Sequence, residues 1–445
     1  MAFHAPEGKR IKRELGTFER ALVIADQYAP FHFVYVLRLE SPPPPQFLGR
    51  ALKSIQSHHP FLRARLLQEN GKYYFTSLVD PILPLRVLPR WNDDHWIKAT
   101  EVELGTRIEH GADPLFRCTY LYDVNQKHAE IILTFFHSIV DDASAGSLMN
   151  ELLKACASFM EEGTVSVYEH PSAPPQETRF PSAFRGVRLT LQTLRYGVQL
   201  ITDEILYRVQ TRDKRTPPLH KKPSHGHILS LTLPGIFIEK LNHRAQLEKV
   251  TLDAVLNAAL MIAVNRRLYA GKNIPMRTFS FWDIRPYVDP PLKNEDLACY
   301  VSMLRHTVLV EGGINPWQLA HSLQWKFYHS LRSGDHFVAA TLTESLLKMV
   351  TAMRSFRMGA TAVNFNGESP LKENYGEIIL NEIHGYTSAY ALGPEFSGQV
   401  RFFNGQLILD FVYLDVDMSN DEARAILEEV KSILNSAVTS PLFVI

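Results

Sequence analysis

The segment from His137 to Asp141, which reads HSIVD, carries the residue types best suited to chemistry in this chain. A neutral histidine has a pKa near physiological pH and can take a proton from an attacking hydroxyl or amine. His137 ends an apolar, strand-like run, and Asp141 follows four positions later, just before a predicted helix. This spacing predicts acyl transfer from a thioester, with His137 as general base and no serine or cysteine nucleophile.

Other catalytic motifs are absent or poorly placed. The sequence contains no GxSxG nucleophile elbow, no GxxxxGK[ST] phosphate loop and no GxGxxG dinucleotide fingerprint. Ser345 and Lys348 have SxxK spacing, but they lie in a helical apolar run and the companion KTG and SDN motifs are missing. His58 and His59 precede Pro60 at a predicted helix end, with no acidic or cysteine partner nearby in the sequence. We therefore predict no metal site.

The elements that would position His137 are strands of the first half of the chain. Strands are predicted, from their β-branched and aromatic side chains, at residues 31–40, 117–124 and 129–137. The third of these is almost continuously apolar, which predicts burial on both faces of a sheet. After it, Asp142 or Ser144 can cap a helix whose apolar face includes Leu148 and Leu152.

Helices and hairpin turns recur along the whole chain in a similar order. Asn70-Gly71 and Asn404-Gly405 are strong signals for tight hairpin turns. Helices are predicted at residues 46–58, 185–210, 236–247, 251–270, 315–332, 338–356 and 421–438. Strands of the second half are predicted at residues 227–234, 277–287, 299–310, 378–387, 399–405 and 406–414.

Two proline-rich segments divide the chain. The first, residues 163–184, is predicted to be a linker, and the second, residues 211–227, a flexible domain boundary. The helix predicted at 185–210 lies between them. That helix could lie on a membrane surface, but Asp203 and Glu204 interrupt its basic face, so we favour a helix that bridges two domains. The predicted organisation is an N-terminal domain at 1–175, a helical linker at 176–225 and a C-terminal domain at 226–445.

Composition excludes several classes of protein. Lys plus Arg and Asp plus Glu both number 47, so the net charge is zero and no basic field favours nucleic acid. The N-terminal segment is basic without an apolar stretch behind it, and no run approaches the length of a membrane span. The 3 cysteines are far apart and form no CxxC pair or zinc spacing, as expected for a reduced, cytoplasmic protein.

The segment Phe136–Asp142 resembles the HHxxxDG signature of a large superfamily. That superfamily includes chloramphenicol acetyltransferase, the condensation domains of nonribosomal peptide synthetases, BAHD acyltransferases and polyketide-associated acyltransferases. His137 and Asp141 match the second histidine and the aspartate of the signature. Phe136 stands at the first histidine and Asp142 at the glycine, so two of four positions depart from it.

Other segments extend this resemblance over nearly the whole chain, in order. Residues 57–64 are similar to the "RHPxLR" segment that follows the first helix of the superfamily. Residues 281–286 and then 297–304 resemble the arginine and "GxFVNTL" stretch of condensation domains, with Ser302 where asparagine is usual. Residues 363–367 are similar to a later "SNLG"-like strand. The DFGWG signature of BAHD enzymes is missing, which argues against that branch.

The resemblance implies an α/β fold of two chloramphenicol acetyltransferase-like domains, each a mixed sheet with flanking helices. The two would form a pseudodimer with a central tunnel that reaches His137, the implied base, from both faces. Asp141 would hold the loop through an ion pair with Arg285. Ser302 and Asn364 are candidates for stabilising an oxyanion, and Asp142 would shape the pocket or cap the helix.

We therefore predict an acyltransferase that forms an ester, or less readily an amide, in natural-product or lipid metabolism. The donor would be acyl-coenzyme A or an acyl group on the phosphopantetheine of a carrier protein, and no cofactor would be bound. The expected protein is a monomer. One alternative is a non-catalytic, condensation-like module that recruits a carrier protein or tailoring enzyme, and another is an amide-forming condensation enzyme.

Overall fold

The chain folds into two compact units. The computed structural model describes residues 10–79, 81–125, 127–161, 163, 165, 168–210, 224–352, 357–388 and 393–442. Unit 1 consists of Met1–Arg179, Ile284–Tyr300 and Glu368–Ser388, and unit 2 of Phe180–Asp283, Val301–Gly367 and Ala389–Ile445. Most of the predicted boundary segment at 211–227 lies outside the described residues. Whereas we predicted one continuous stretch for each domain, two segments of the second half of the chain belong to unit 1.

Unit 1 is built on a six-stranded mixed sheet with the strand order β12-β13-β2-β7-β6-β5. Its strands are β2 (His32–Glu40), β5 (Leu85–Leu88), β6 (Phe116–Leu121), β7 (His128–Phe136), β12 (Asn374–Tyr375) and β13 (Ile378–Thr387). β2 runs antiparallel to both β7 and β13, and only β5 pairs in parallel, with β6. Every residue of β7 after His128 is buried, as its apolar run predicts.

Pairing between β2 and β13 explains why a late segment belongs to unit 1. β13 lies more than 300 positions after β2 in the chain, yet the two strands pair from Ile379–Glu40 to Thr387–Phe33. The backbone groups of β13 find their hydrogen-bond partners in the first sheet, which ties residues 368–388 to it. No local periodicity contains this information, because alternating hydrophobicity marks a strand but not its neighbour.

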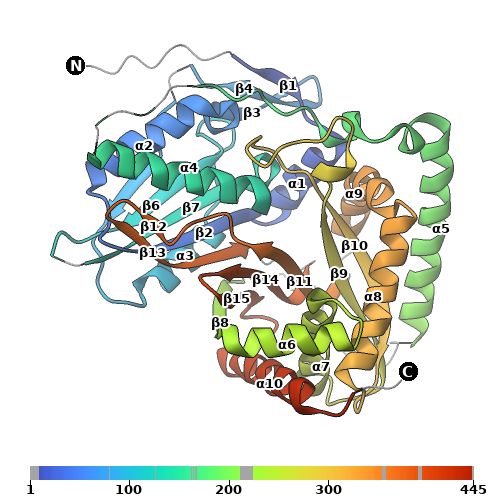
Figure 1. Cartoon of the computed structure of the whole chain (residues 1–445). Coiled ribbons are helices and arrows are strands. Elements are labelled where there is room, and N and C mark those ends of the chain that lie inside the picture. Colours follow the sequence, from blue (N-terminus) through green and yellow to red (C-terminus); the bar gives the residue numbers. More distant parts are fainter. Residues whose placement is uncertain are drawn as a thin grey trace. The chain divides into compact units, whose positions relative to one another are not determined.

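Helices cover both faces of the six-stranded sheet. The helices of unit 1 are α1 (Thr17–Tyr28), α2 (Pro45–His58), α3 (His95–Gly105) and α4 (Asp142–Glu161). α2 and α4 pack side by side on one face, and α3 packs on β2 and β7 at the other (Figure 1). A small sheet of order β1-β4-β3 completes the unit, with β1 (Lys12–Glu14), β3 (Ala64–Glu69) and β4 (Lys72–Ser77). The predicted turn at Asn70-Gly71 joins β3 to β4, with both residues at positive φ.

Unit 2 combines a four-stranded sheet with a long hairpin. The sheet has the order β11-β14-β15-β8, with β8 (Gly226–Leu233), β11 (Gly359–Glu368), β14 (Pro394–Phe403) and β15 (Gln406–Leu414). The hairpin pairs β9 (Ile274–Asp283) with β10 (Val301–Val310). The helices are α5 (Gly186–Gln210), α6 (Gly235–Leu247), α7 (Leu252–Leu268), α8 (Pro316–Arg332), α9 (Asp335–Ala352) and α10 (Asn420–Thr439). These mixed sheets with flanking helices confirm the predicted α/β class.

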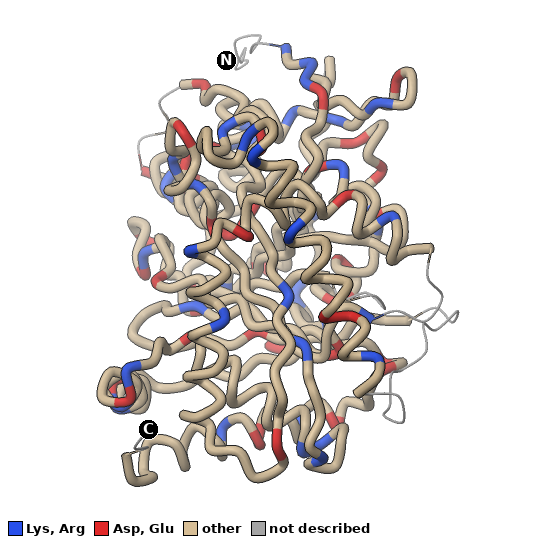
Figure 2. The backbone as a smooth tube through the Cα atoms, turned by 90° about the vertical axis from the view of Figure 1, so that its right-hand side faces the viewer, with Lys and Arg blue, Asp and Glu red and all other residues tan. Residues whose placement is uncertain are grey.

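Two sequence signals of unit 2 appear as predicted. Thr251 caps α7 by accepting a hydrogen bond from the backbone amide of Ala254, and the helix runs through the core with 13 buried residues. Asn404-Gly405 forms the hairpin turn between β14 and β15, with both residues at positive φ. Charged residues of both signs are interspersed along the described backbone in Figure 2, in keeping with the zero net charge.

Helix α5 is unusual because it buries only Tyr196 in its 25 residues. Exposed apolar side chains recur along it at helical spacing, at Val187, Leu191, Leu194, Val198, Ile201, Ile205 and Val209. Asp203 and Glu204, which interrupt its basic face, lie near Arg277 and Arg305 of the β9–β10 hairpin. None of the described helices combines the length and hydrophobicity of a membrane span.

Candidate active site

His137 follows the last residue of β7 and begins a short 3-10 turn, His137–Ile139. Its Nδ1 lies 3.1 Å from the backbone oxygen of Val140. Because a carbonyl oxygen can only accept, Nδ1 must donate its hydrogen, which in the neutral ring leaves the lone pair on Nε2. The turn after β7 therefore selects the tautomer in which Nε2 can act as a base.

Two aromatic rings of the β2 region flank the imidazole. The register of the sheet pairs His32 with Phe136, so the residues beside His32 lie next to His137. Phe33 stacks on the His137 ring at a centroid distance of 5.3 Å and an interplanar angle of 8°, and Phe31 lies 5.4 Å away. Burial lowers the pKa of His137 below its ordinary value and keeps the imidazole neutral at physiological pH.

Asp141 and Arg285, the predicted supporting pair, come together within unit 1. Arg285 Nη1 donates to Asp141 Oδ2, and both side chains are buried. The same Oδ2 accepts the backbone N–H of Tyr300 at 2.8 Å, while Arg285 Nη2 donates to the carbonyl of Ala298 at 2.9 Å. Asp141 thus ties the turn after β7 to the 284–300 segment, and its oxygens are occupied by structural contacts.

The other oxygen of Asp141 caps helix α4. Oδ1 accepts the backbone N–H of Ser144 at 3.0 Å and lies 2.9 Å from its hydroxyl, while the Asp141 N–H points to Ser144 Oγ at 3.3 Å. Our prediction that Asp142 or Ser144 caps this helix is therefore wrong. Asp142 is the first helical residue, and the carboxylate one position earlier reaches the third helical amide, as an N-cap side chain does.

Phe136 and Asp142, which differ from the HHxxxDG signature that this segment resembles, both make contacts within unit 1. Phe136 is fully buried, and its ring lies 4.2 Å from the ring of His110. Asp142 accepts a hydrogen bond from the hydroxyl of Tyr35, a fully buried residue of β2. Asp142 is thus connected to the sheet, a role that glycine could not fill.

The two candidate oxyanion donors both lie in unit 2. Ser302 is fully buried on β10, and its hydroxyl donates its only hydrogen to the carbonyl of His336 at 2.6 Å. Asn364 on β11 donates one amide hydrogen to Gln399 Oε1 at 2.9 Å. A side-chain amide has a second hydrogen, whereas the Ser302 hydroxyl does not, so Asn364 keeps the greater capacity to donate.

The sequence analysis did not identify several residues of the site. Tyr35, Phe33 and the backbone amide of Tyr300 reach the HSIVD turn only through long-range contacts. The contact between Asp141 and Ser144 could have been predicted from the sequence. The two residues are separated by the interval between an N-cap residue and the third helical residue, which is common at helix starts. Cys299 is a further neighbour, with its sulfur 3.8 Å from His137 Nδ1.

Unit 2 contains an apolar cavity of about 510 Å³ between α5, α9 and the β9–β10 hairpin. Aliphatic, aromatic and thioether groups dominate its wall, including Tyr196, Leu200, Leu342, Leu346 and Met358. Charged side chains line it at Glu204, Arg208 and Arg305. A cavity of this size and composition suits the hydrocarbon part of a small molecule.

One family model matches part of the chain. Residues 239–366 match the model described as phthiocerol/phthiodiolone dimycocerosyl transferase C-terminus. The matched stretch runs from α6 through α7, the hairpin, α8 and α9 to β11. No curated protein matches the chain.

Solved structures match almost the full length at low sequence identity. Polyketide synthase associated protein 5 from Mycobacterium tuberculosis has a TM-score of 0.70 and 15% identity, over 96% of this chain and 98% of that chain. Trichothecene 15-O-acetyltransferase from Fusarium sporotrichioides has a TM-score of 0.77 and 10% identity, over 96% of both chains. The first condensation domain of the CDA synthetase has a TM-score of 0.69 and 12% identity, over 97% of this chain and 98% of that chain. At these identities the likeness shows the fold.

Proposed function

We propose that this chain, a member of the chloramphenicol acetyltransferase-like superfamily of condensation domains and acyltransferases, moves an acyl group from a thioester to a hydroxyl with His137 as the base. The observation that carries the proposal is the Nδ1–H to Val140 hydrogen bond, which leaves Nε2 ready to accept a proton. The lowered pKa of His137 keeps that nitrogen unprotonated at neutral pH. A general base of this kind contributes about 10²- to 10⁴-fold to a rate.

The proposed reaction has two steps. His137 Nε2 takes the proton from the acceptor hydroxyl as its oxygen attacks the thioester carbonyl carbon, which forms a tetrahedral oxyanion. The carbon–sulfur bond then breaks, and the departing thiolate takes the proton back from the imidazolium. Val140 accepts from Nδ1 throughout, so it orients the ring and favours the imidazolium that forms between the steps.

Asp141 and Arg285 act on the reaction through position alone. Both oxygens of Asp141 and both Nη atoms of Arg285 make contacts within unit 1, and the two side chains are buried, so neither is offered to a substrate. The pair holds the turn from which His137 projects. Of the two candidate oxyanion donors of unit 2, Asn364 keeps the greater capacity to donate, because Ser302 gives its only hydrogen to His336.

The apolar cavity of unit 2 supports a hydrophobic substrate. We propose that it accepts the aliphatic chain of the acyl donor or of the acceptor alcohol, as expected for an enzyme of lipid or polyketide metabolism. The donor head group would be coenzyme A or the phosphopantetheine of a carrier protein. Both present the same thioester, so the source must be decided by experiment.

The test is a product assay on the full chain. Wild type is mixed with acyl-coenzyme A of several chain lengths, or acylated carrier protein, and with long-chain alcohols and amines, and products are identified by mass spectrometry. We expect esters from wild type and a rate at least about 100-fold lower for His137→Ala. His243→Ala is the matched control, because His243 is an exposed histidine of α6. A folded His137→Ala variant with the wild-type rate would refute the proposal.

The same assay separates the alternatives. Amides without esters would identify an amide-forming condensation enzyme. Binding of a carrier protein without any product would favour the non-catalytic module. The retained histidine and its selected tautomer favour catalysis over that module, since a non-catalytic copy has no need of either.

A further inference from the structure

Four side chains from three parts of unit 1 form a polar cluster around Glu151. His58 and His59 end helix α2, immediately before Pro60, and Glu151 projects from the middle of α4. His58 Nδ1 lies 2.5 Å from Glu151 Oε1, and His59 Nε2 lies 2.8 Å from Oε2. The sequence suggested no acidic partner for the two histidines, and that expectation is wrong because α2 and α4 pack side by side.

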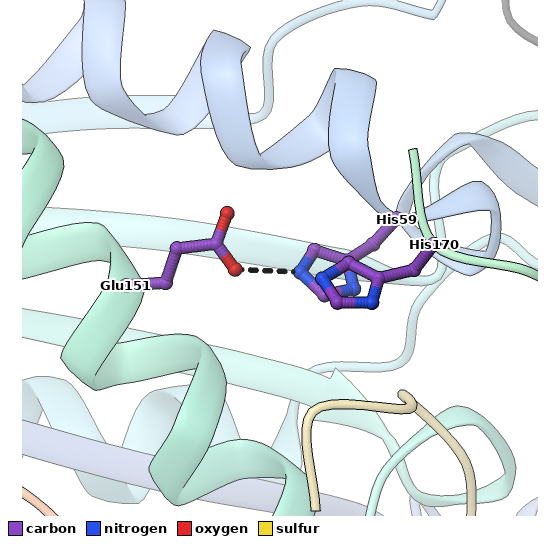
Figure 3. A group of neighbouring side chains, drawn as sticks. All are labelled: His59, Glu151 and His170. Atoms are coloured by element: carbon purple, nitrogen blue, oxygen red, sulfur yellow. Dashed lines mark hydrogen bonds and ion pairs between the residues drawn. The ribbon is translucent and has the colours of Figure 1, made fainter. Parts of the chain in front are cut away.

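His170 brings a third imidazole to the cluster. Its backbone N–H donates to the carbonyl of His58 at 2.8 Å, which fixes the segment against the end of α2. Its ring stacks on the His59 ring with centroids 4.5 Å apart and an interplanar angle of 12°. Figure 3 shows both rings presenting nitrogen-bearing edges toward the Glu151 carboxylate.

The donor atoms are close enough to share one ion. One ligand atom each from His59, Glu151 and His170 lie within 4.8 Å of one another. In a tetrahedral site two atoms that each bind zinc at about 2.1 Å lie about 3.4 Å apart, so donor atoms at the 4.8 Å limit would need to approach by about 1.4 Å when the ion binds. Glu151 and His170 are partly exposed, which leaves a route for an ion.

Charge and hydrogen bonding at the cluster suit a divalent cation. Glu151 offers a carboxylate whose two oxygens lie beside imidazole nitrogens, Oε1 beside His58 and Oε2 beside His59. Nδ1 of His59 is buried without a hydrogen-bond partner among the described residues, so only one of the two ring nitrogens of His59 is hydrogen-bonded.

We propose that His59, Glu151 and His170 form a zinc site, with His58 hydrogen-bonded to the second oxygen of the Glu151 carboxylate. Two imidazoles and a carboxylate are a ligand set that zinc accepts, and a water molecule would complete four-coordination. His58 would donate to the oxygen that does not bind the metal, as outer partners of metal ligands commonly do. The ion would fasten residues 168–170 to both α2 and α4. This inference does not depend on the proposed acyl transfer.

The plainer reading is an ion-pair cluster without metal, in which Glu151 accepts hydrogen bonds from His58, His59 and the hydroxyl of Tyr168. That reading accounts for His58 and His59 but gives the His170 ring no role beyond stacking. The two readings differ in what His170→Ala does to metal binding. His170 is partly exposed, so its removal is not expected to unfold the chain.

The test uses the full chain, stripped of metal with a chelator and titrated with Zn²⁺ by calorimetry. We expect one Zn²⁺ per chain for wild type, loss of stoichiometric binding for His170→Ala and Glu151→Gln, and an affinity about 10- to 100-fold lower for His58→Gln. His243→Ala should bind as wild type does. Co²⁺ in place of Zn²⁺ provides a second readout, since its visible absorption reports four-coordination.

Thermal denaturation separates loss of a ligand from loss of the fold. Zn²⁺ should raise the melting temperature of wild type and leave that of His170→Ala unchanged, while the two metal-free proteins melt at similar temperatures. A folded wild type that takes up no stoichiometric Zn²⁺ would overturn the proposal. Binding by His170→Ala at wild-type strength would overturn it equally. Acyl transfer is not a readout in either experiment, so failure of one proposal leaves the other standing.

Discussion

Asp141 and Arg285 are 144 positions apart in the sequence and form an ion pair that is almost completely shielded from water. Each partner also makes a second contact, since Asp141 caps α4 through Ser144 and Arg285 binds the carbonyl of Ala298. The turn that carries His137 is therefore held at its C-terminal end by contacts to two separate segments. This arrangement makes the aspartate of the HSIVD motif a positioning residue.

Replacing Asp141 with alanine should destabilise unit 1. The change removes the carboxylate partner of the buried Arg285 and the cap of α4, and the loss of one partner of a buried pair costs about 3–5 kcal/mol. Urea denaturation measures this free energy of unfolding, and the rate of acyl transfer should fall with it. Arg266→Ala, which breaks a more exposed pair with Glu429, is the control and should cost under about 1 kcal/mol. An unchanged unfolding midpoint for Asp141→Ala would contradict the structural role.

The pH dependence of the reaction should reflect the lowered pKa of His137. Only the neutral imidazole can accept a proton, so kcat/KM should rise with pH through the pKa of the free enzyme and then level off. Because burial lowers that pKa, the plateau should extend below pH 6.5, the ordinary value for histidine. A kcat/KM profile for the slow chemical step measures this. A midpoint above pH 6.5 would mean that the environment of His137 differs from the one described.

Tyr35 and Asp142 should be energetically coupled. Asp142→Gly introduces the glycine of the HHxxxDG signature that this segment resembles, but it removes an acceptor of the buried Tyr35 hydroxyl, which should cost about 1–3 kcal/mol. In Tyr35→Phe the hydroxyl is already gone, so the same Asp142→Gly change should cost less there. A double-mutant cycle measured by urea denaturation should give a coupling of about 0.5 kcal/mol or more. Strict additivity would show that the hydrogen bond contributes nothing.

Lowering the pH should reduce the free energy of unfolding, in part because His306 takes up a proton on unfolding. Burial lowers the pKa of His306 to about 3, and the ring makes a hydrogen bond to Ser280 at 2.9 Å. Since the folded pKa is below the unfolded value of 6.5, the unfolded state binds more protons between these values. The contribution of His306 is therefore complete above pH 6.5 and is lost as pH falls toward 3. Unfolding free energies from about pH 7 to about pH 4 should fall less steeply for His306→Gln than for wild type, with His243→Gln as control.

Filling the cavity of unit 2 should shift substrate preference. Gly197 lines the cavity from α5, and a Cβ built there meets nothing within 4 Å, so the first atom of a side chain fits without a clash. Gly197→Phe should raise KM more for long acyl chains or alcohols than for short ones. Gly197→Ala is the matched control, because it improves helix propensity by about 1 kcal/mol and leaves the cavity largely open. Equal effects on the KM of short and long substrates would show that the cavity does not bind the substrate chain.

Much of the local structure follows from the sequence. The turns at Asn70-Gly71 and Asn404-Gly405, the Thr251 cap and the buried strand before His137 are set by residues within a few positions of one another. Such interactions depend on short-range sterics and hydrogen bonds, which periodicity and turn residues report directly. Helix α1 is not among the predicted elements, and its N-cap Gly16 offers no side-chain signal.

The sequence by itself also determined that His137 and Asp141 stand at the junction of a buried strand and a helix. Only the tertiary structure decided which atoms they use, because the partners Val140, Arg285 and Tyr300 depend on where the backbone turns and returns. The same holds for His59, which meets Glu151 only when α2 and α4 pack. Hydrophobic patterning directs faces toward a core, but the pairing of side chains across that core depends on contacts distant in sequence.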